Sequence, residues 1–257
     1  MKKVGLLLTL CSRGQKYREI GDTDIISIFL EGFLNTAEQN KYEYHFYLGY
    51  DDDDQFYIDN IKSLQLRLPN CVVTKLTGCQ GNPCKAWNDL LKEHWQECEY
   101  FYQVGTDIRL LTGGWTTYFI NTLKKNGNIG IIGGVDKAYW YARTGTYKQG
   151  IIENAFFHRT QYKIFGYLFH PKLKNWFSDD YISEVYYNNN CCFISPYVLF
   201  RNTNRVCQKD FEDRYIPDMS IQKSIGGIIE EDTEKLKRYR TERNLLLLDG
   251  NLDAVSL

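Results

Sequence analysis

Three groups of side chains that can bind a ligand or accept a proton stand at the ends of predicted strands or the start of a predicted helix. The first is a run of four acids, Asp51–Asp54. The second is Gly105-Thr106-Asp107, and the third is the pair Asp179-Asp180. Parallel strands end at one edge of a sheet, and open α/β sheets bind their ligands there. We therefore expect the three groups to meet in one cleft.

Each group has a chemical interpretation. A single carboxylate such as Asp107 suffices for Mg2+ or Mn2+ when a diphosphate supplies the remaining oxygen ligands. Asp179 and Asp180 are suited to accept a proton from a hydroxyl group. Two structural alternatives stay open, because Asp51–Asp54 can be a solvated loop, and acids in the first turn of a helix also stabilise its dipole.

The elements that must position these groups alternate between strand and helix. This order is typical of an α/β fold, a three-layer α/β/α arrangement with a mainly parallel central sheet. We predict one α/β domain over residues 1–204 and a C-terminal helical extension over 205–257, packed on it. The predicted strands are Lys3–Leu10, Tyr44–Leu48, Cys71–Leu76, Tyr100–Val104 and Asn128–Ile132, and the predicted helices are Asp22–Asn40, Pro83–Cys98, Trp115–Lys125, a helix that begins near Asp179, and Ile228–Leu248.

Composition restricts the classes of function. Lys and Arg total 31 against 32 Asp and Glu, so the net charge of −1 offers no overall field for nucleic acid, and we expect no nucleic-acid partner. No stretch reaches the roughly 18 apolar residues of a membrane span. The apolar run Val4–Leu10 is short for an export signal, so we expect a buried first strand, a cytoplasmic protein and reduced cysteines.

The ordered set of motifs resembles the nucleotide-sugar glycosyltransferases of the GT-A fold, of family 2 type, and especially the short soluble forms encoded by large DNA viruses. The resemblance covers residues 3–187. It is carried by Thr9, Ser12 and Arg13 after the first strand and by the segments YDDDD, GNPCKAWNDLL, QVGTDI followed by GGW, FFHRTQYKIFGYLF and NWFSDDYISEVY. If the chain is virus-encoded, the cytoplasm is that of a host cell.

The resemblance implies roles for individual positions on the donor side. The residues that it implies for nucleotide binding are Thr9, Ser12, Arg13, Asp51, Asp53, Lys85, Asn88 and Thr106. Asp107 matches the last acid of the family's DXD motif, which holds Mn2+ or Mg2+ on the diphosphate. The chain departs from the motif at Gly105 and Thr106, where members of the family often carry a second acid.

On the acceptor side, the resemblance implies that Asp179 or Asp180 removes the acceptor's proton in an inverting transfer. Trp140, His158 and Trp176 are candidates for the acceptor-binding surface, because the apolar faces of sugars pack on aromatic rings. Core packing is the alternative for each of them. The function implied is transfer of a sugar from a UDP- or GDP-linked donor to a hydroxyl of a glycan or glycoprotein.

Two other functions stay open at this point. Thr106, where a second acid is expected, also suits a non-catalytic module that binds a nucleotide or sugar. A sugar nucleotidyltransferase shares the architecture. Such enzymes typically have a glycine-rich first loop with several basic residues, which the segment CSRGQKYR matches only weakly. The C-terminal helix also offers a surface for self-association.

Overall fold

Strand β1 (Lys2–Leu10) lies inside the central sheet of the protein, between β2 (Tyr42–Asp51) and β4 (Tyr100–Gln103) and parallel to both. The computed structural model describes residues 1–137, 150–203 and 216–248. The apolar run Val4–Leu8 makes β1 suitable for this place, because strands covered on both faces need near-continuous apolar sequence. Val4, Leu6, Leu7 and Leu8 are all fully buried.

Within the described residues, eight strands form one sheet in the order β3-β2-β1-β4-β7-β6-β8-β5. Six strands run in the same direction, and β5 and β7 run against their neighbours. The remaining strands are β3 Cys71–Leu76, β5 Ile108–Leu110, β6 Ile131–Asp136, β7 Phe156–His158 and β8 Cys192–Asn202. The α/β class and the mainly parallel sheet are confirmed.

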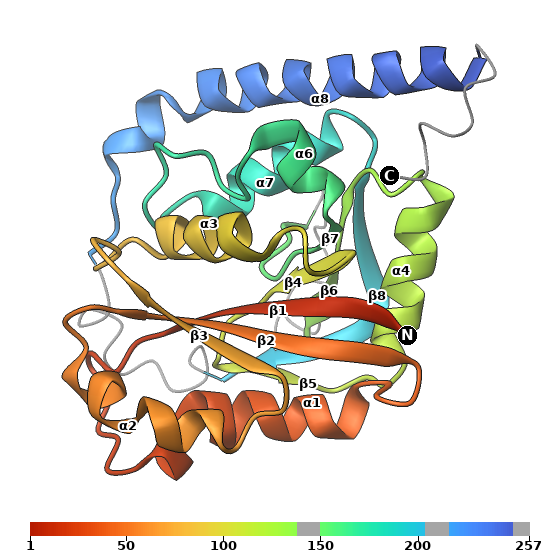
Figure 1. Cartoon of the computed structure of the whole chain (residues 1–257). Helices are drawn as coiled ribbons and strands as arrows, with labels where there is room; N and C mark the ends of the chain where they lie inside the picture. The colour runs from red at the N-terminus through yellow and green to blue at the C-terminus, as the bar shows by residue number, and fades with distance from the viewer. Residues whose placement is uncertain (138–149, 204–215, 249–257) are drawn as a thin grey trace.

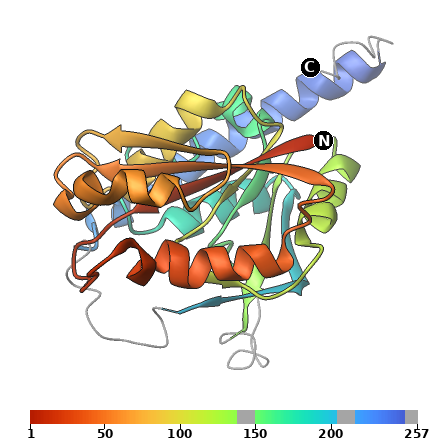
Figure 2. The same cartoon turned by 60° about the horizontal axis from the view of Figure 1, so that its bottom comes forward.

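Helices cover both faces of the sheet (Figures 1 and 2). One core packs η2, α1, α2 and α4 on the sheet, and the second packs α3, α6, α7 and α8 on the other face. The helices are η1 Ile20–Asp22, the π-helix η2 Ile25–Leu30, α1 Glu31–Thr36, α2 Gln55–Gln65, α3 Pro83–His94, α4 Trp115–Lys125, α6 Thr160–Phe165, α7 Ser178–Tyr187, η4 Ser220–Lys223 and α8 Ile225–Leu248.

Helix α8 lies outside α6 and α7 as an additional layer (Figure 1). Its buried side chains, Ile228, Ile229 and Leu236, belong to the second core. Asn189, after α7, donates to the carbonyl of Thr233, and Arg240 donates to the carbonyl of Asn189. The predicted C-terminal helix is therefore present. The boundary predicted at 204/205 lies outside the described residues and stays a prediction.

Several predicted elements need correction. Helices α2 and α6 and strands β5, β7 and β8 were not predicted, and β6 begins at Ile131 and continues to Asp136 instead of ending at Ile132. No helix in the described part of the chain is both long enough and apolar enough to cross a membrane.

Candidate functional site

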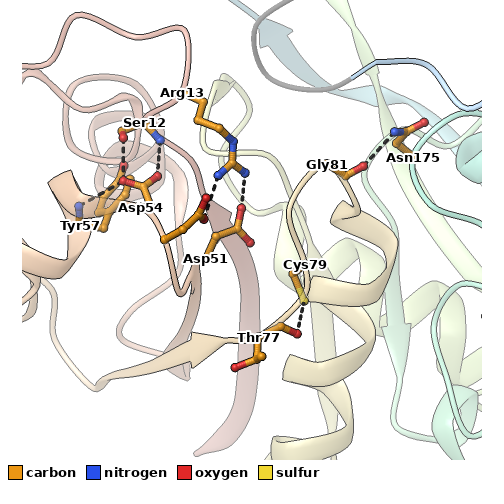
Figure 3. A network of polar contacts seen from close by, with 10 residues as sticks. Ser12, Arg13, Asp51, Asp54, Tyr57, Thr77, Cys79, Gly81 and Asn175 are labelled. Carbon is orange, nitrogen blue, oxygen red and sulfur yellow. Dashed lines mark hydrogen bonds and ion pairs between the residues drawn. The ribbon is translucent and has the colours of Figure 1, made fainter.

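The loops after β1 and β2 are joined by an ion pair at the edge where the parallel strands end, called here the carboxyl edge. Arg13 pairs with Asp51 (Figure 3), and its other terminal nitrogen lies 3.3 Å from Asp53. Burial raises the pKa of the Asp51 carboxyl group, and the Arg13 guanidinium opposes that rise. Asp53 is half exposed, so it is open to a ligand. The structure thus brings together Arg13, Asp51 and Asp53, as predicted.

Ser12 and Asp54 fix the shape of this corner. Asp54 caps α2, because its side chain accepts from the backbone N–H of Tyr57. The same carboxylate accepts from the backbone N–H of Ser12 at 2.7 Å and from its hydroxyl at 2.6 Å (Figure 3). Thr9 is half-buried near the end of β1, on the face that α3 covers. Ser12 thus holds the first loop to the second, while its hydroxyl oxygen keeps accepting capacity.

Lys85 lies at the same edge, in the first turn of α3. Its ammonium group donates to Asp89 at 2.6 Å and to the carbonyl of Thr77 at 2.9 Å. It also lies 3.4 Å from the sulfur of Cys79. The side chain is 41% exposed, so the ammonium group faces solvent while Asp89 balances its charge.

Asn88 has a structural role in the described residues. Its amide oxygen accepts from the backbone N–H groups of Leu168 and Phe169, and its amide nitrogen donates to the carbonyl of Phe169 at 2.7 Å. These bonds join α3 to the segment between α6 and α7. The Asn88 amide thus already makes three hydrogen bonds within the protein. Its contact with a nucleotide stays a prediction.

The motif after β4 places Asp107 against Gly105. A Cβ atom at position 105 would lie 2.5 Å from the carboxylate Oδ1 of Asp107, so the absence of a side chain there makes room for this carboxylate. A side chain at position 105 would therefore require the Asp107 carboxylate to move.

Asn154 is a residue of this corner that the sequence did not identify. Its amide oxygen accepts from the backbone N–H of Gly105 at 3.2 Å, and its amide nitrogen is buried with no hydrogen-bond partner in the described part of the chain. The carbonyl of Asp107 accepts from the backbone N–H and hydroxyl of Thr203. Asn154 comes at the end of a stretch without strand or helix periodicity, so no pattern marked it.

Asp107 is the candidate ligand for a divalent cation at the carboxyl edge. Over residues 1–137, 150–203 and 216–248, no three His, Cys, Asp or Glu side chains are placed to hold a metal ion together. Asp107 offers one half-buried carboxylate. One carboxylate fits Mg2+ or Mn2+ when a diphosphate and water provide the other ligands. The residues therefore fit a cation that binds together with a diphosphate.

Asn175 connects the start of α7 to the loop before α3. Its amide nitrogen donates to the carbonyl of Gly81 at 2.9 Å (Figure 3). Its amide oxygen accepts from the backbone N–H groups of Trp176 and Asp218. The bond between Asn175 and Gly81 places the start of α7, with Asp179 and Asp180, at the carboxyl edge. The carboxylate of Asp179 also raises the pKa of the Cys84 thiol in the first turn of α3, although burial is the larger cause.

The turn into α7 is strained. Phe177 has a φ of 65°, in the left-handed region that side chains rarely adopt. Such strain persists only where surrounding contacts impose it, and it concentrates at functional sites. The turn leaves Trp176 43% exposed, two residues before α7 begins. The ring of Trp176 is thus exposed, and its contact with an acceptor stays a prediction. Asp179 and Asp180 occupy the first turn of α7.

Two acceptor candidates have different outcomes. The prediction for His158 is wrong, because His158 pairs with Tyr100 at the start of β4, whereas Asp107 follows the end of that strand. Its ring is mostly buried against Tyr100, with centroids 5.1 Å apart. Trp140 lies outside the described residues.

The comparisons with known proteins concern the fold. No protein-family model matches the chain, and no curated protein is a significant relative. Its structure is similar to that of S. aureus TarS residues 1–349 in complex with UDP-GlcNAc, with a TM-score of 0.58 and 14% identity over 90% of this chain and 66% of that one. For the same fragment in complex with UDP, the TM-score is 0.51 and the identity 15%, over 77% and 60% of the two chains. For the longer TarS structure the TM-score is 0.50 and the identity 15%, over 77% of this chain. This chain covers 36% of that longer TarS chain. At this level of identity the similarity concerns architecture alone, and the chain has a GT-A-like α/β fold.

Proposed function

We propose that the protein is a glycosyltransferase that moves a sugar from a nucleoside diphosphate, most simply UDP, to a hydroxyl of an acceptor. The observation that carries this proposal is that the Arg13–Asp51 pair, Asp107 and the start of α7 all lie along the carboxyl edge of a GT-A-like sheet. That this fold in TarS accommodates UDP-GlcNAc and UDP also supports it.

The donor's nucleotide would bind over the loops after β1 and β2. Asp53 is half exposed and offers carboxylate oxygens to the hydroxyl and N–H groups of a ribose or base. Arg13 keeps the loop in place through its ion pairs. Asp51 is largely buried and acts through Arg13. Lys85 lies at the same edge, and its ammonium group stays partly exposed although it pairs with Asp89. Its positive charge would attract the diphosphate.

Asp107 would hold the cation with the diphosphate. A bound Mg2+ or Mn2+ supplies positive charge that offsets the charge growing on the diphosphate as it leaves. Gly105 leaves the space in which the Asp107 carboxylate lies. Asn154 fixes the backbone of Gly105 by its 3.2 Å hydrogen bond, and it is buried near the strand end that carries Asp107.

Asp180 is the better candidate for the base. Its side chain is exposed, whereas that of Asp179 lies 3.4 Å from the Ser178 hydroxyl in the turn. As the acceptor oxygen attacks the anomeric carbon, its proton passes to the carboxylate of Asp180, and the bond between that carbon and the diphosphate breaks. Attack from the face opposite the diphosphate inverts the configuration. Trp176, four residues before Asp180, offers an exposed ring for the acceptor sugar.

A panel of UDP- and GDP-sugars with Mn2+, Mg2+ or EDTA tests the proposal, with the melting temperature and nucleotide release as readouts. We expect a cation-dependent rise in melting temperature with one donor and release of its nucleotide when an acceptor is present. Asp107→Asn should remove the cation-dependent part. Asp59→Asn, an exposed change on α2, is the matched control. No shift with any donor, or shifts that Asp107→Asn leaves intact, would contradict the proposal.

A non-catalytic nucleotide-sugar module is the second candidate, and the single acid of the Gly105–Asp107 motif favours it. The same panel separates the two, because a module gives the melting shift without release of nucleotide from any donor. Release of pyrophosphate from UTP and a sugar phosphate would instead identify a nucleotidyltransferase.

A further inference from the structure

Residues 150–155 connect the middle of α7 to the end of β4, and we call them the linking segment. The backbone N–H of Ile152 donates to the hydroxyl of Ser183, on α7, at 2.8 Å. Two bonds join Ala155 to Gln103, the last residue of β4. The N–H of Gln103 donates to the carbonyl of Ala155 at 2.9 Å, and the N–H of Ala155 donates to the side-chain oxygen of Gln103 at 3.1 Å. The linking segment is thus held at both of its ends.

Asn154 lies between these two anchors and is 3% exposed. Its carbonyl oxygen lies 3.0 Å from the place that a Cβ atom on Gly133 would occupy, so the linking segment also packs closely against β6. The backbone of Asn154 is therefore fixed by β4, β6 and α7 together. A side chain can position another group only when its own place is fixed in this way.

The group that Asn154 holds is the backbone beneath the Asp107 carboxylate. Its amide oxygen accepts from the backbone N–H of Gly105 at 3.2 Å. The Oδ1 atom of Asp107 lies 2.5 Å from the Cβ position of Gly105, so this carboxylate rests directly against the Gly105 backbone. Thr203 holds the other end of the motif, because its N–H and hydroxyl both donate to the carbonyl of Asp107 at 3.0 Å. A shift of Gly105 would therefore move the place in which the carboxylate lies.

The other half of the Asn154 amide does not stabilise the fold. Its nitrogen is buried and has no hydrogen-bond partner among the residues that the structure describes. Buried donors without partners are rare and costly in proteins, and each of them calls for an explanation. The cost indicates that Asn154 does not serve stability alone, whereas the bond of its oxygen to Gly105 serves the motif that carries Asp107.

We propose that Asn154 is a positioning residue of the donor site, which acts through the backbone of Gly105 to hold the Asp107 carboxylate where it binds the cation. This inference rests on the proposed function and adds to it a residue that touches neither the donor nor the cation. The effect of Asn154 is confined to the cation-dependent part of donor binding, because separate bonds of Ser12 and Arg13 hold the nucleotide loops after β1 and β2.

Calorimetric titration with UDP, in Mn2+ and in EDTA, tests this role. Residues that orient a metal ligand typically change metal affinity by about 10- to 100-fold when they are replaced. We therefore expect Asn154→Ala to bind UDP at least about tenfold more weakly in Mn2+ and equally well in EDTA. Ser183→Ala is the matched control, because it removes another buried hydrogen bond of the linking segment without touching residues 105–107. It should leave both affinities unchanged.

Hydrogen exchange of the Gly105 amide, followed by NMR, reports the hydrogen bond itself and needs no ligand. We expect slow exchange in the parent protein and in Ser183→Ala, and faster exchange in Asn154→Ala, because its Gly105 N–H has lost its acceptor. Urea unfolding shows whether each variant is folded. Fast exchange of Gly105 in the parent protein would overturn the proposal, even if Asn154→Ala does not fold.

The outcomes separate this inference from the proposed function. A parent protein that binds no UDP, or binds it equally in Mn2+ and EDTA, contradicts the proposed cation site, and the role of Asn154 is lost with it. Cation-dependent binding that Asn154→Ala leaves intact overturns the role of Asn154 alone. Equal losses of affinity in Mn2+ and EDTA, or an equal loss in Ser183→Ala, would show a general effect on the fold and would also overturn that role.

Discussion

The carboxylate of Asp232 on α8 accepts a 2.6 Å hydrogen bond from the hydroxyl of Tyr181, the residue that follows Asp180 on α7. Asp232 is fully buried, and it also accepts from the hydroxyl of Tyr167 and pairs with Lys235 at 3.0 Å. The C-terminal helix is thereby fixed to the first turn of the helix that carries the proposed base. The packing of the C-terminal helix on α7 thus helps to fix the position of Asp180.

Removal of the Asp232 carboxylate should destabilise the protein strongly. In Asp232→Ala, two tyrosine hydroxyls and the Lys235 ammonium lose their shared acceptor, and the expected loss in free energy of unfolding is about 3–5 kcal/mol. Tyr181→Phe removes one donor and leaves Tyr167 and Lys235 in place, so its expected loss is about 1 kcal/mol. Urea unfolding measures both. Equal losses in the two variants would contradict the central place of Asp232.

The space at Gly105 should control the metal dependence of donor binding. In Gly105→Ala, the new Cβ lies 2.5 Å from the position of the Asp107 Oδ1, so the carboxylate must turn away. We expect about tenfold weaker UDP binding in Mn2+, about 1.4 kcal/mol, and little change in EDTA. Gly226→Ala is the control, because no atom lies within 4 Å of its Cβ position. Unchanged binding in Mn2+ would show that Asp107 does not hold the cation.

The larger part of the fold could be predicted from the sequence, because most of its elements have a strong pattern. The apolar run of β1 and the stripe of α4 identify their type and bounds closely. Helix α2 was missed because Asp54 was considered only as an acid of a possible ligand loop, although a capping Asp before Phe56, Tyr57, Ile61 and Leu64 is also typical of a helix start.

Strand β8 could not be predicted because it contains Pro196, and proline inside a run argues against a strand. The sheet accommodates it by an irregularity, since Gly133 pairs with Ile194 while Val135 pairs with Leu199. Gly134 permits this, because a Cβ there would lie 2.4 Å from the carbonyl oxygen of Val198. Such a fit between distant backbones leaves no local signal.

The candidate site was predictable where acids follow strands and unpredictable where roles depend on distant partners. Arg13, Asp51 and Asp107 lie as the strand-end rule requires. The prediction for His158 was wrong because an aromatic segment gives no indication of strand direction, and β7 runs antiparallel to β4. Asn88 and Asn154 form bonds to backbone groups that only the folded chain brings near.

The two acids of α7 should separate into a base and a structural residue. Asp180→Asn keeps the shape of the side chain but cannot accept a proton, so we expect kcat to fall by roughly 10²- to 10⁴-fold with the KM for the donor unchanged. Asp179→Asn should change kcat far less, because Asp179 faces the turn at Ser178. Initial rates of nucleotide release measure both. The reverse order of effects would assign the base to Asp179, and full activity in both variants would remove the base from this pair.

Acid should destabilise the protein through His158. Its pKa is lowered to about 3 in the folded chain, first by burial and then by the charges of Arg159, Lys163, Arg243 and Lys2, whereas the unfolded chain takes up the proton near the ordinary value of 6.5. A lowered histidine pKa contributes stability above 6.5 that is lost as the pH falls from 6.5 towards 3. Between pH 6.5 and 4.5 the expected loss from this residue is about 2 kcal/mol.

His158→Gln removes the titrating group but keeps a polar side chain beside Thr160, which hydrogen-bonds the imidazole at 2.6 Å. The variant should be no more stable than the parent at pH 7, yet it should lose less free energy of unfolding between pH 6.5 and 4.5. Urea unfolding at several pH values gives this difference directly, since the acids of the chain titrate equally in both proteins and cancel. Parallel pH profiles for parent and variant would show that His158 takes up its proton equally well in the folded and the unfolded chain, which is incompatible with a lowered pKa of His158 in the folded chain.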